Sequence, residues 1–147
     1  MSEMIGNQYF LVRQYNLAAK EFENSIHAED YNVQILKKLI ICYTMVNKPG
    51  KALNLFLSLI NKDIDLLINQ KNESINYPSK EIILRIENGE VGYEDDFTFF
   101  YVLGMLNFFC DLNNSLKYFQ KANKINSKDI RITIIIKMLK KKLVKLN

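Results

Sequence analysis

The sequence predicts an all-α protein built from repeated helical hairpins, and three observations support this. Small and aromatic residues recur at a spacing of 34 positions, a length typical of repeats made of two helices. The 147 residues include only five glycines and two prolines, too few for a turn-rich β-sandwich. Hydrophobic residues make up 48% and charged residues 24%, and the length predicts a single domain over residues 1–147.

The repeat is carried by residues at matching positions of three stretches. Tyr9, Ala18 and Phe22 in the first stretch each have a counterpart 34 residues later. These counterparts are Tyr43, Ala52 and Phe56. In a third stretch, Ser115 and Phe119 take the places of the alanine and the phenylalanine, and Gly104 precedes them. Small residues at helix crossings let two backbones approach closely, while large rings fill the space between hairpins. We therefore expect the recurring aromatic side chains to be core.

The first two repeats are expected at about residues 2–31 and 32–64. Apolar side chains at helical spacing predict helices over 2–13, 16–28, 33–46 and 50–69. Residues 65–96 then break the pattern. Within them, a short helix is predicted over 80–88, opened by Pro78 and ended by Gly89. Since no small-residue crossing remains in this stretch, we favour an irregular insertion over a degenerate repeat.

The third repeat is expected at about residues 97–127, with helices over 97–110 and 113–125. Residues 97–110 contain no charged side chain, which predicts a helix buried on most sides. Asp95 or Asp96 is expected to cap it, because a carboxylate can accept hydrogen bonds from free N–H groups. A last helix over 128–146, capped by Ser127, should pack an apolar face on the preceding hairpin. That face is formed by Ile132, Ile135, Ile136, Leu139, Leu143 and Leu146.

These motifs resemble the tetratricopeptide repeat (TPR) family, whose repeats are pairs of antiparallel helices. The matching motifs are Leu/Ile-Gly-x-x-Tyr and Ala-x-x-x-Phe-x-x-Ala, and the resemblance covers about residues 2–62 and 97–127. Ile40 stands where the family has glycine, and Asn107 where it has tyrosine. The resemblance implies a small three-repeat protein: a TPR-like right-handed helical-hairpin solenoid with a C-terminal capping helix.

In the family, the first helices line a concave groove that holds a partner segment. The resemblance places nine residues of this chain on such a groove: Phe10, Leu11, Lys37, Ile41, Met45, Tyr101, Met105, Phe108 and Phe109. The set is mostly apolar and aromatic, which suits varied apolar anchors of a partner. An exposed patch of this kind needs a cover. A partner segment, the chain's own residues 70–96 and a second copy of the chain are the alternatives.

Positive charge is concentrated at the C-terminal end of the chain. The formal net charge is +4, and the basic tail comprises Lys137, Lys140, Lys141, Lys142 and Lys145. Lysines on the outer face of a capping helix keep the end of a solenoid soluble. Contact with anionic lipid, an acidic partner or nucleic acid is the alternative for this tail.

The sequence contains no motif for catalysis or metal binding. His27 is the single histidine, and Cys42 and Cys110 lie among apolar residues, where cysteine packs as a small hydrophobe. GxxxxGK[ST], GxGxxG and HExxH are all absent. We therefore expect no enzymatic activity, no metal site and no cofactor.

The predicted function is a non-catalytic protein–protein interaction module, namely an adaptor, scaffold or assembly chaperone with a partner segment in its apolar groove. A permanent structural subunit of a larger complex is one alternative, and a type III secretion-like chaperone is another. We expect a protein partner (a peptide, a helix or neighbouring subunits) and neither a small-molecule substrate nor nucleic acid. Homo-oligomerisation and a membrane contact of the last helix stay open. Residues 1–6 lack the features of a signal peptide, so a cytoplasmic location is expected.

Overall fold

The computed structural model describes residues 2–27, 32–68 and 79–146, and every regular element in these ranges is helical. The prediction of an all-α protein is therefore confirmed. Residues 28–31, at the end of the first predicted repeat, lie outside the described residues. The same holds for residues 69–78 of the predicted insertion, including Pro78.

The chain divides into two compact units, Met1–Phe56 and Leu57–Asn147. The division falls inside α4 (Pro49–Asp63), which belongs to the second predicted repeat. A single domain over residues 1–147 stays a prediction, and each of the two units is described by itself.

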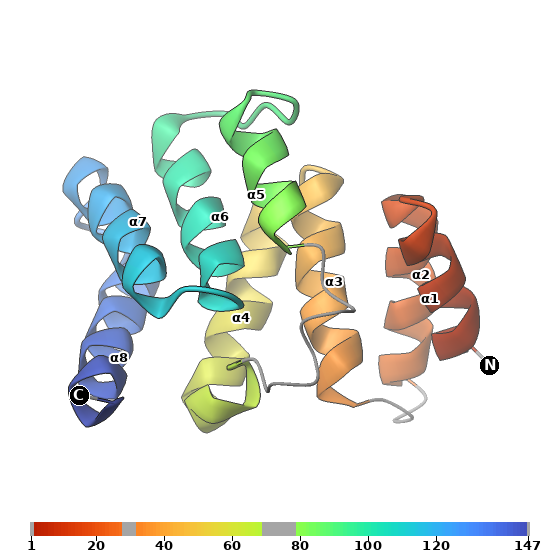
Figure 1. The fold of residues 1–147 in the computed structure, drawn as a ribbon, viewed down its shortest axis with the longest axis horizontal. Helices are drawn as coiled ribbons and strands as arrows, with labels where there is room; N and C mark the ends of the chain where they lie inside the picture. Colours follow the sequence, from red (N-terminus) through yellow and green to blue (C-terminus); the bar gives the residue numbers. More distant parts are fainter. Residues whose placement is uncertain (1, 28–31, 69–78, 147) are drawn as a thin grey trace. The chain divides into compact units, whose positions relative to one another are not determined.

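The first unit contains α1 (Ser2–Leu11), α2 (Tyr15–His27) and α3 (Val33–Met45), with α2 packed against both others (Figure 1). These bounds agree within two residues with the predicted helices. Asn32 caps α3, because its Oδ1 accepts a hydrogen bond from the Ile35 N–H at 3.2 Å. The Tyr43 hydroxyl of α3 donates to Glu23 Oε2 of α2 at 2.7 Å. This hydrogen bond ties the second helix of the first hairpin to the helix that follows.

The second unit contains α5 (Ser79–Glu87), α6 (Asp96–Phe108), α7 (Leu112–Ile125) and α8 (Ile130–Leu146). Helix α6 packs against α5 and α7, and α7 packs against α8 (Figure 1). Helix α5 confirms the short helix predicted within the insertion, and Gly89 ends it with a φ of +81°, a conformation that favours glycine.

Two helix ends differ from the predicted ones, for local reasons. The helix predicted to reach residue 69 ends at Asp63, where Oδ1 accepts from the Asp65 N–H at 3.0 Å and a 3-10 turn, Ile64–Leu66, follows. The last helix starts at Ile130, and Asp129 rather than Ser127 supplies the accepting oxygen, 3.1 Å from the Arg131 nitrogen. Asp95 does cap α6 as predicted, accepting from the Thr98 N–H at 2.8 Å.

Each unit contains one very close helix crossing between a glycine and a phenylalanine ring. A Cβ atom at Gly6 of α1 would lie 2.7 Å from Cε1 of Phe22 in α2. A Cβ atom at Gly104 of α6 would lie 2.8 Å from Cδ2 of Phe119 in α7. Both rings are fully buried. The small residues therefore lie at helix crossings as predicted, and both rings are core, but at these crossings each ring packs within its own hairpin rather than between hairpins.

The second crossing is also fixed by a hydrogen bond. Ser115, four residues before Phe119, donates from its hydroxyl to the Gly104 carbonyl oxygen at 2.6 Å. Ala18 stands four residues before Phe22 and is fully buried. A small residue beside the ring thus accompanies the glycine in both units, which lets the two backbones approach.

We predict that Gly104→Ala destabilises the protein by about 1–2 kcal/mol. The added methyl group overlaps three atoms of the buried Phe119 ring, and overpacking outweighs the gain in helix propensity. Chemical denaturation followed by circular dichroism measures the change.

Gly50→Ala in α4 is the matched control, because a Cβ atom there meets nothing within 4 Å. This control should leave stability unchanged or raise it by up to about 1 kcal/mol. Equal stability of Gly104→Ala and the wild type would show that the helices can move apart without cost.

Candidate functional site

The predicted groove residues are mostly buried in the structure. Leu11 is 79% exposed and Met45 is half-buried. The other seven are buried: Phe10, Lys37, Ile41, Tyr101, Met105, Phe108 and Phe109. A surface that receives a partner needs exposed side chains, so the expectation of an open apolar groove at these seven positions is wrong.

Part of the cover over α6 comes from the predicted insertion itself. Helix α5 packs against α6 and buries Ile82 and Ile86. Tyr93 lies near Tyr101. The pKa of Tyr93 is raised, mainly because the side chain is buried and to a smaller extent because of the neighbouring Tyr101 phenol. Helix α5 and Tyr93 therefore lie against α6, and both belong to residues 70–96, one of the three covers considered from the sequence.

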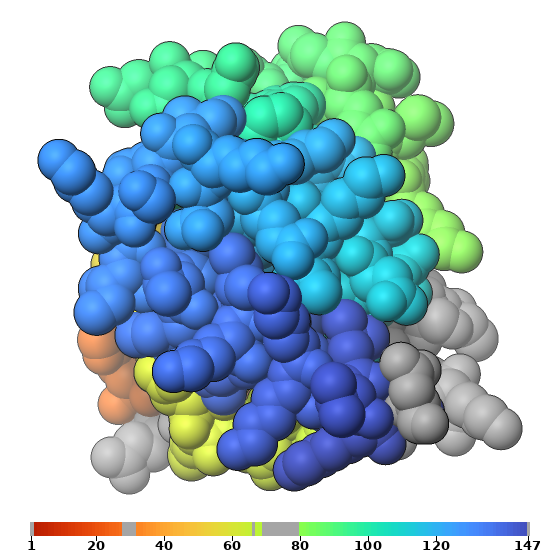
Figure 2. Space-filling view, turned by 90° about the vertical axis from the view of Figure 1, so that its left-hand side faces the viewer, coloured from red at the N-terminus to blue at the C-terminus, as the bar shows by residue number. Residues whose placement is uncertain are grey.

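The open, charged surface of the second unit is formed by α7 and α8, which Figure 2 faces. Residues 112–147 hold ten basic residues and one acidic residue, Asp129. Residues 1–111 hold ten basic and fifteen acidic residues. The basic character therefore begins with α7, before the tail in which the sequence analysis placed it.

A groove of about 540 Å³ runs between α7 and α8. Its lining consists of four lysines, two amide side chains and one apolar residue: Lys117, Lys121, Lys124, Lys140, Gln120, Asn123 and Ile136. We call it the α7–α8 groove. Of the predicted basic tail, Lys140 lies in it, while Lys137, Lys141 and Lys145 are exposed elsewhere on α8.

Lys142, the remaining member of the predicted tail, has a structural contact instead. Its Nζ lies 2.5 Å from Asp65 Oδ1, and its side chain is only 19% exposed. This ion pair joins α8 to the 3-10 turn within the second unit. Lys142 therefore contributes to the packing of α8, in contrast to the exposed lysines of the basic tail.

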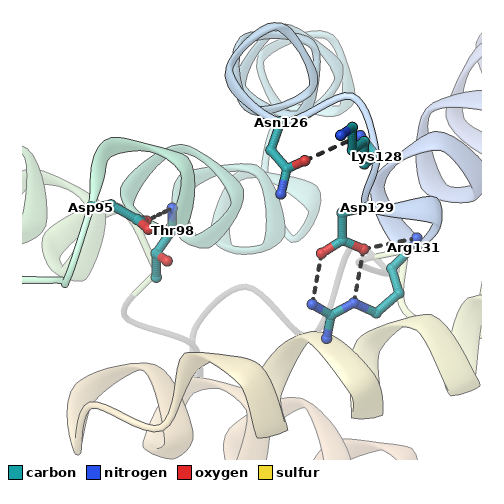
Figure 3. A network of polar contacts seen from close by, with 6 residues as sticks. All are labelled: Asp95, Thr98, Asn126, Lys128, Asp129 and Arg131. Carbon is teal, nitrogen blue, oxygen red and sulfur yellow. Dashed lines mark hydrogen bonds and ion pairs between the residues drawn. The ribbon is translucent and has the colours of Figure 1, made fainter.

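Asp129, the one acidic residue of the stretch 112–147, lies in the turn between α7 and α8 and is already paired. Arg131 donates from Nε to Asp129 Oδ1 at 3.0 Å and from Nη2 to Oδ2 at 2.7 Å (Figure 3). These bonds lower the pKa of Asp129. In the same view, Asn126 Oδ1 accepts from the Lys128 N–H at 3.1 Å. The turn between the helices is thus fixed internally, and Asp129 does not neutralise the lysines of the α7–α8 groove.

Two groove side chains have distinctive surroundings. Lys121 Nζ lies 5.6 Å from the ring centre of Phe100 and 5.4 Å from that of Tyr118, so cation–π attraction positions its charge. Asn123 Oδ1 is buried and has no hydrogen-bond partner among the described residues. A buried acceptor without a donor is costly. Asn123 is therefore the groove residue with an unmet bonding requirement.

Sequence reasoning missed the lysines of α7, although a signal was present. Lys117, Lys121 and Lys124 are spaced four and three residues apart, which places them on one helix face. The predicted basic tail includes lysines of the last helix alone, so the lysines of α7 were not grouped with those of α8.

The reactive side chains of the described residues show little activation. Cys42 is buried, and burial raises its pKa to about 12. Cys110 is exposed, contrary to the expectation of a small core residue, and partial burial of its sulfur raises its pKa. Both thiols stay protonated at neutral pH, whereas nucleophilic cysteines need a lowered pKa. Among the described residues, no group of three or more His, Cys, Asp or Glu side chains could hold a metal ion.

Comparison with models of protein families, with curated proteins and with solved structures finds no match to this chain. In the part of the chain that the structure describes, no helix has both the length and the apolar character needed to cross a bilayer.

We predict that Phe108→Glu lowers the free energy of unfolding by about 3–5 kcal/mol. Phe108 is 2% exposed, so the substitution buries a carboxylate without a basic partner. Leu11→Glu is the matched control, since it adds the same charge at another predicted groove position that is exposed. It should change stability by no more than about 0.5 kcal/mol. Thermal melting compares the two variants. A wild-type melting temperature for Phe108→Glu would contradict the burial of Phe108 and support the open groove predicted from the sequence.

We predict that Asp129→Asn destabilises the protein by about 1 kcal/mol at neutral pH. Asparagine keeps the capping oxygen, so the loss isolates the charged pair with Arg131. Because folding lowers the pKa of Asp129, its contribution is complete above the ordinary value of 3.8 and is lost as pH falls through the folded value.

The stability difference between Asp129→Asn and the wild type should therefore vanish in acid, as measured by denaturation at neutral and acidic pH. Asp95→Asn, at a cap whose hydrogen bond comes from Thr98, is the control and should cost less. A difference that persists well below pH 3.8 would contradict the role assigned to the carboxylate charge.

Proposed function

We propose that this chain is a non-catalytic protein–protein interaction module of TPR-like helical hairpins, acting as an adaptor, scaffold or assembly chaperone. The observation that carries the proposal is the repeated crossing of Gly6 with Phe22 and of Gly104 with Phe119. Two hairpins in separate units thus share one construction. Proteins built by stacking such hairpins use their extended surfaces for binding.

The chemistry of the described side chains supports a non-catalytic role. The Cys42 thiol has a raised pKa, and His27 lies exposed at the end of α2, where no other histidine is available. Catalytic acids, bases and nucleophiles normally have pKa values shifted toward the working pH. The shifts of both cysteines run in the opposite direction from that of an activated nucleophile.

The α7–α8 groove replaces the predicted apolar groove as the proposed binding surface. It combines a concave shape with exposed lysine side chains, whereas Met105 and Phe108 are buried. A type III secretion-like chaperone depends on an open apolar groove, so the burial of these residues removes the feature on which that alternative rests.

A permanent structural subunit is the second candidate, favoured by exposed large apolar side chains. Leu11 is 79% exposed, Val144 is 76% exposed and Ile130 is 68% exposed. Such residues would be covered in a permanent assembly. They are spread over different helix ends, whereas an obligate interface requires a broad continuous apolar surface.

Selection of peptides from a random phage-displayed library tests the proposed function. The full chain is immobilised, and enriched peptides are synthesised and measured by isothermal titration calorimetry. An interaction module should yield peptides that bind the folded chain with about micromolar dissociation constants. Size-exclusion chromatography with light scattering should show a monodisperse chain.

The Leu103→Glu variant is the control for this selection, because Leu103 is fully buried and the added charge should unfold the protein. Peptides that bind this unfolded variant as tightly as they bind the wild type would indicate nonspecific binding to exposed apolar side chains. Failure to select any fold-dependent peptide would contradict the interaction module. A chain that aggregates alone would instead favour the structural subunit.

A further inference from the structure

We propose that the α7–α8 groove binds an extended acidic segment of a partner protein. This inference rests on the proposed function and adds the chemical class of the partner and the residues that recognise it. It commits to a peptide that carries carboxylate side chains and backbone N–H groups.

The positive charge of the groove is not compensated by acidic side chains of its lining. Lys117, Lys121, Lys124 and Lys140 line the groove, and the lining includes no acidic side chain. No ion pair joins any of these four lysines to an acidic side chain of the described residues. Asp129 already bonds to Arg131. Four ammonium groups around one concave surface raise the local concentration of an anionic ligand.

The spacing of the α7 lysines matches that of side chains on an extended peptide. Lys117 and Lys121 lie four residues apart on α7, which separates them by roughly 6 Å along the helix axis. In an extended chain, alternate side chains point to the same side at intervals of roughly 6.6 Å. A peptide lying along α7 can therefore present alternate carboxylates to successive lysines. Lys140 lines the same groove from α8.

Asn123 has a hydrogen-bond acceptor without a donor among the described residues. The Asn123 side chain belongs to the lining of the groove. Its Oδ1 is buried and accepts no hydrogen bond from the described residues. Once the side-chain amide turns toward the groove, a peptide backbone N–H can donate to this oxygen. The ionised phosphate groups of nucleic acids and lipids are themselves acceptors and cannot donate to it.

The lining also differs from that of surfaces suited to phosphate polymers or membranes. Arginine, which binds phosphate through two parallel hydrogen bonds, is absent from the groove, and Arg131 is occupied by Asp129. Membrane-surface helices insert a broad apolar face, whereas Ile136 is the single apolar residue of the lining. A peptide partner satisfies both the lysines and Asn123.

The test measures binding of a fluorescein-labelled oligoglutamate peptide to the full chain by fluorescence anisotropy at low salt. Lys117→Glu/Lys140→Glu should weaken binding by about tenfold or more, and added salt should weaken wild-type binding. Lys20→Glu/Lys62→Glu changes the net charge equally at exposed lysines of α2 and α4. This control should bind close to the wild type, and circular dichroism verifies that both double variants are folded.

Asn123→Leu separates a peptide from a phosphate ligand. It should weaken oligoglutamate binding severalfold and leave binding of inorganic polyphosphate unchanged, because the removed acceptor serves a backbone N–H and polyphosphate has none. Tighter binding of oligothymidylate or phosphatidylserine vesicles than of oligoglutamate would overturn the peptide assignment. Wild-type-like peptide binding by Asn123→Leu would overturn it as well.

Two further results would overturn the proposed site: no oligoglutamate binding by the wild type, or equal binding by Lys117→Glu/Lys140→Glu. If phage selection still yields fold-dependent peptides whose binding ignores Lys117 and Lys140, the interaction module stands and the α7–α8 groove is not its site. If selection yields none, the proposed function itself fails.

Discussion

The close approach of a glycine to a buried phenylalanine ring is the constraint on which both units depend. At Gly6 and Gly104 the backbone lies so near Phe22 and Phe119 that a single methyl group would overlap the ring. This proximity sets the distance between the two helices of each hairpin. With the hairpin fixed, its remaining apolar faces can pack against the next helix.

The α7–α8 groove is a consequence of the same packing. Phe119 holds α7 against α6, and α8 buries Ile132, Ile135 and Leu139 as it packs on α7. With the apolar sides of α7 and α8 turned inward, their lysines are left outward. Like charges on neighbouring helices repel one another, and water and salt reduce this repulsion at an exposed surface. An acidic ligand would remove it.

The helices and the glycine crossings could be predicted from the sequence, because both depend on local spacing. Apolar side chains repeat with the period of a helix, and Gly104 and Phe119 stand in the same order as Gly6 and Phe22. The start of α8 was harder to place. Ser127 and Asp129 are both good caps two residues apart, and the pairing of Asp129 with Arg131 decides between them.

The groove could not be predicted correctly, because two sequence signals conflicted. Position relative to the repeat motif placed Tyr101, Met105 and Phe108 on an open surface. The absence of charge from residues 97–110 predicted burial on most sides, and the structure follows this second signal. Helical spacing shows which residues share a face of one helix, but it does not show that the following connection folds α5 back against α6.

The α7–α8 groove in turn combines side chains from two helices. Lys117 and Lys140 are 23 positions apart in the sequence, and their common groove follows only from the antiparallel packing of α7 and α8. A wheel projection of α7 alone would have shown its lysine face. It would not have shown that Asn123 lies beside those lysines with a buried oxygen that lacks a donor.

The central claim, that partner recognition occurs at the α7–α8 groove, is tested most directly by nuclear magnetic resonance. Backbone amide signals of the isotope-labelled chain are followed while oligoglutamate peptide is added. The account predicts saturable shifts concentrated at residues 117–124 and 136–140, with a large shift of the Asn123 side-chain amide. Shifts confined to Met1–Phe56, or the absence of saturable shifts in α7 and α8, would contradict it.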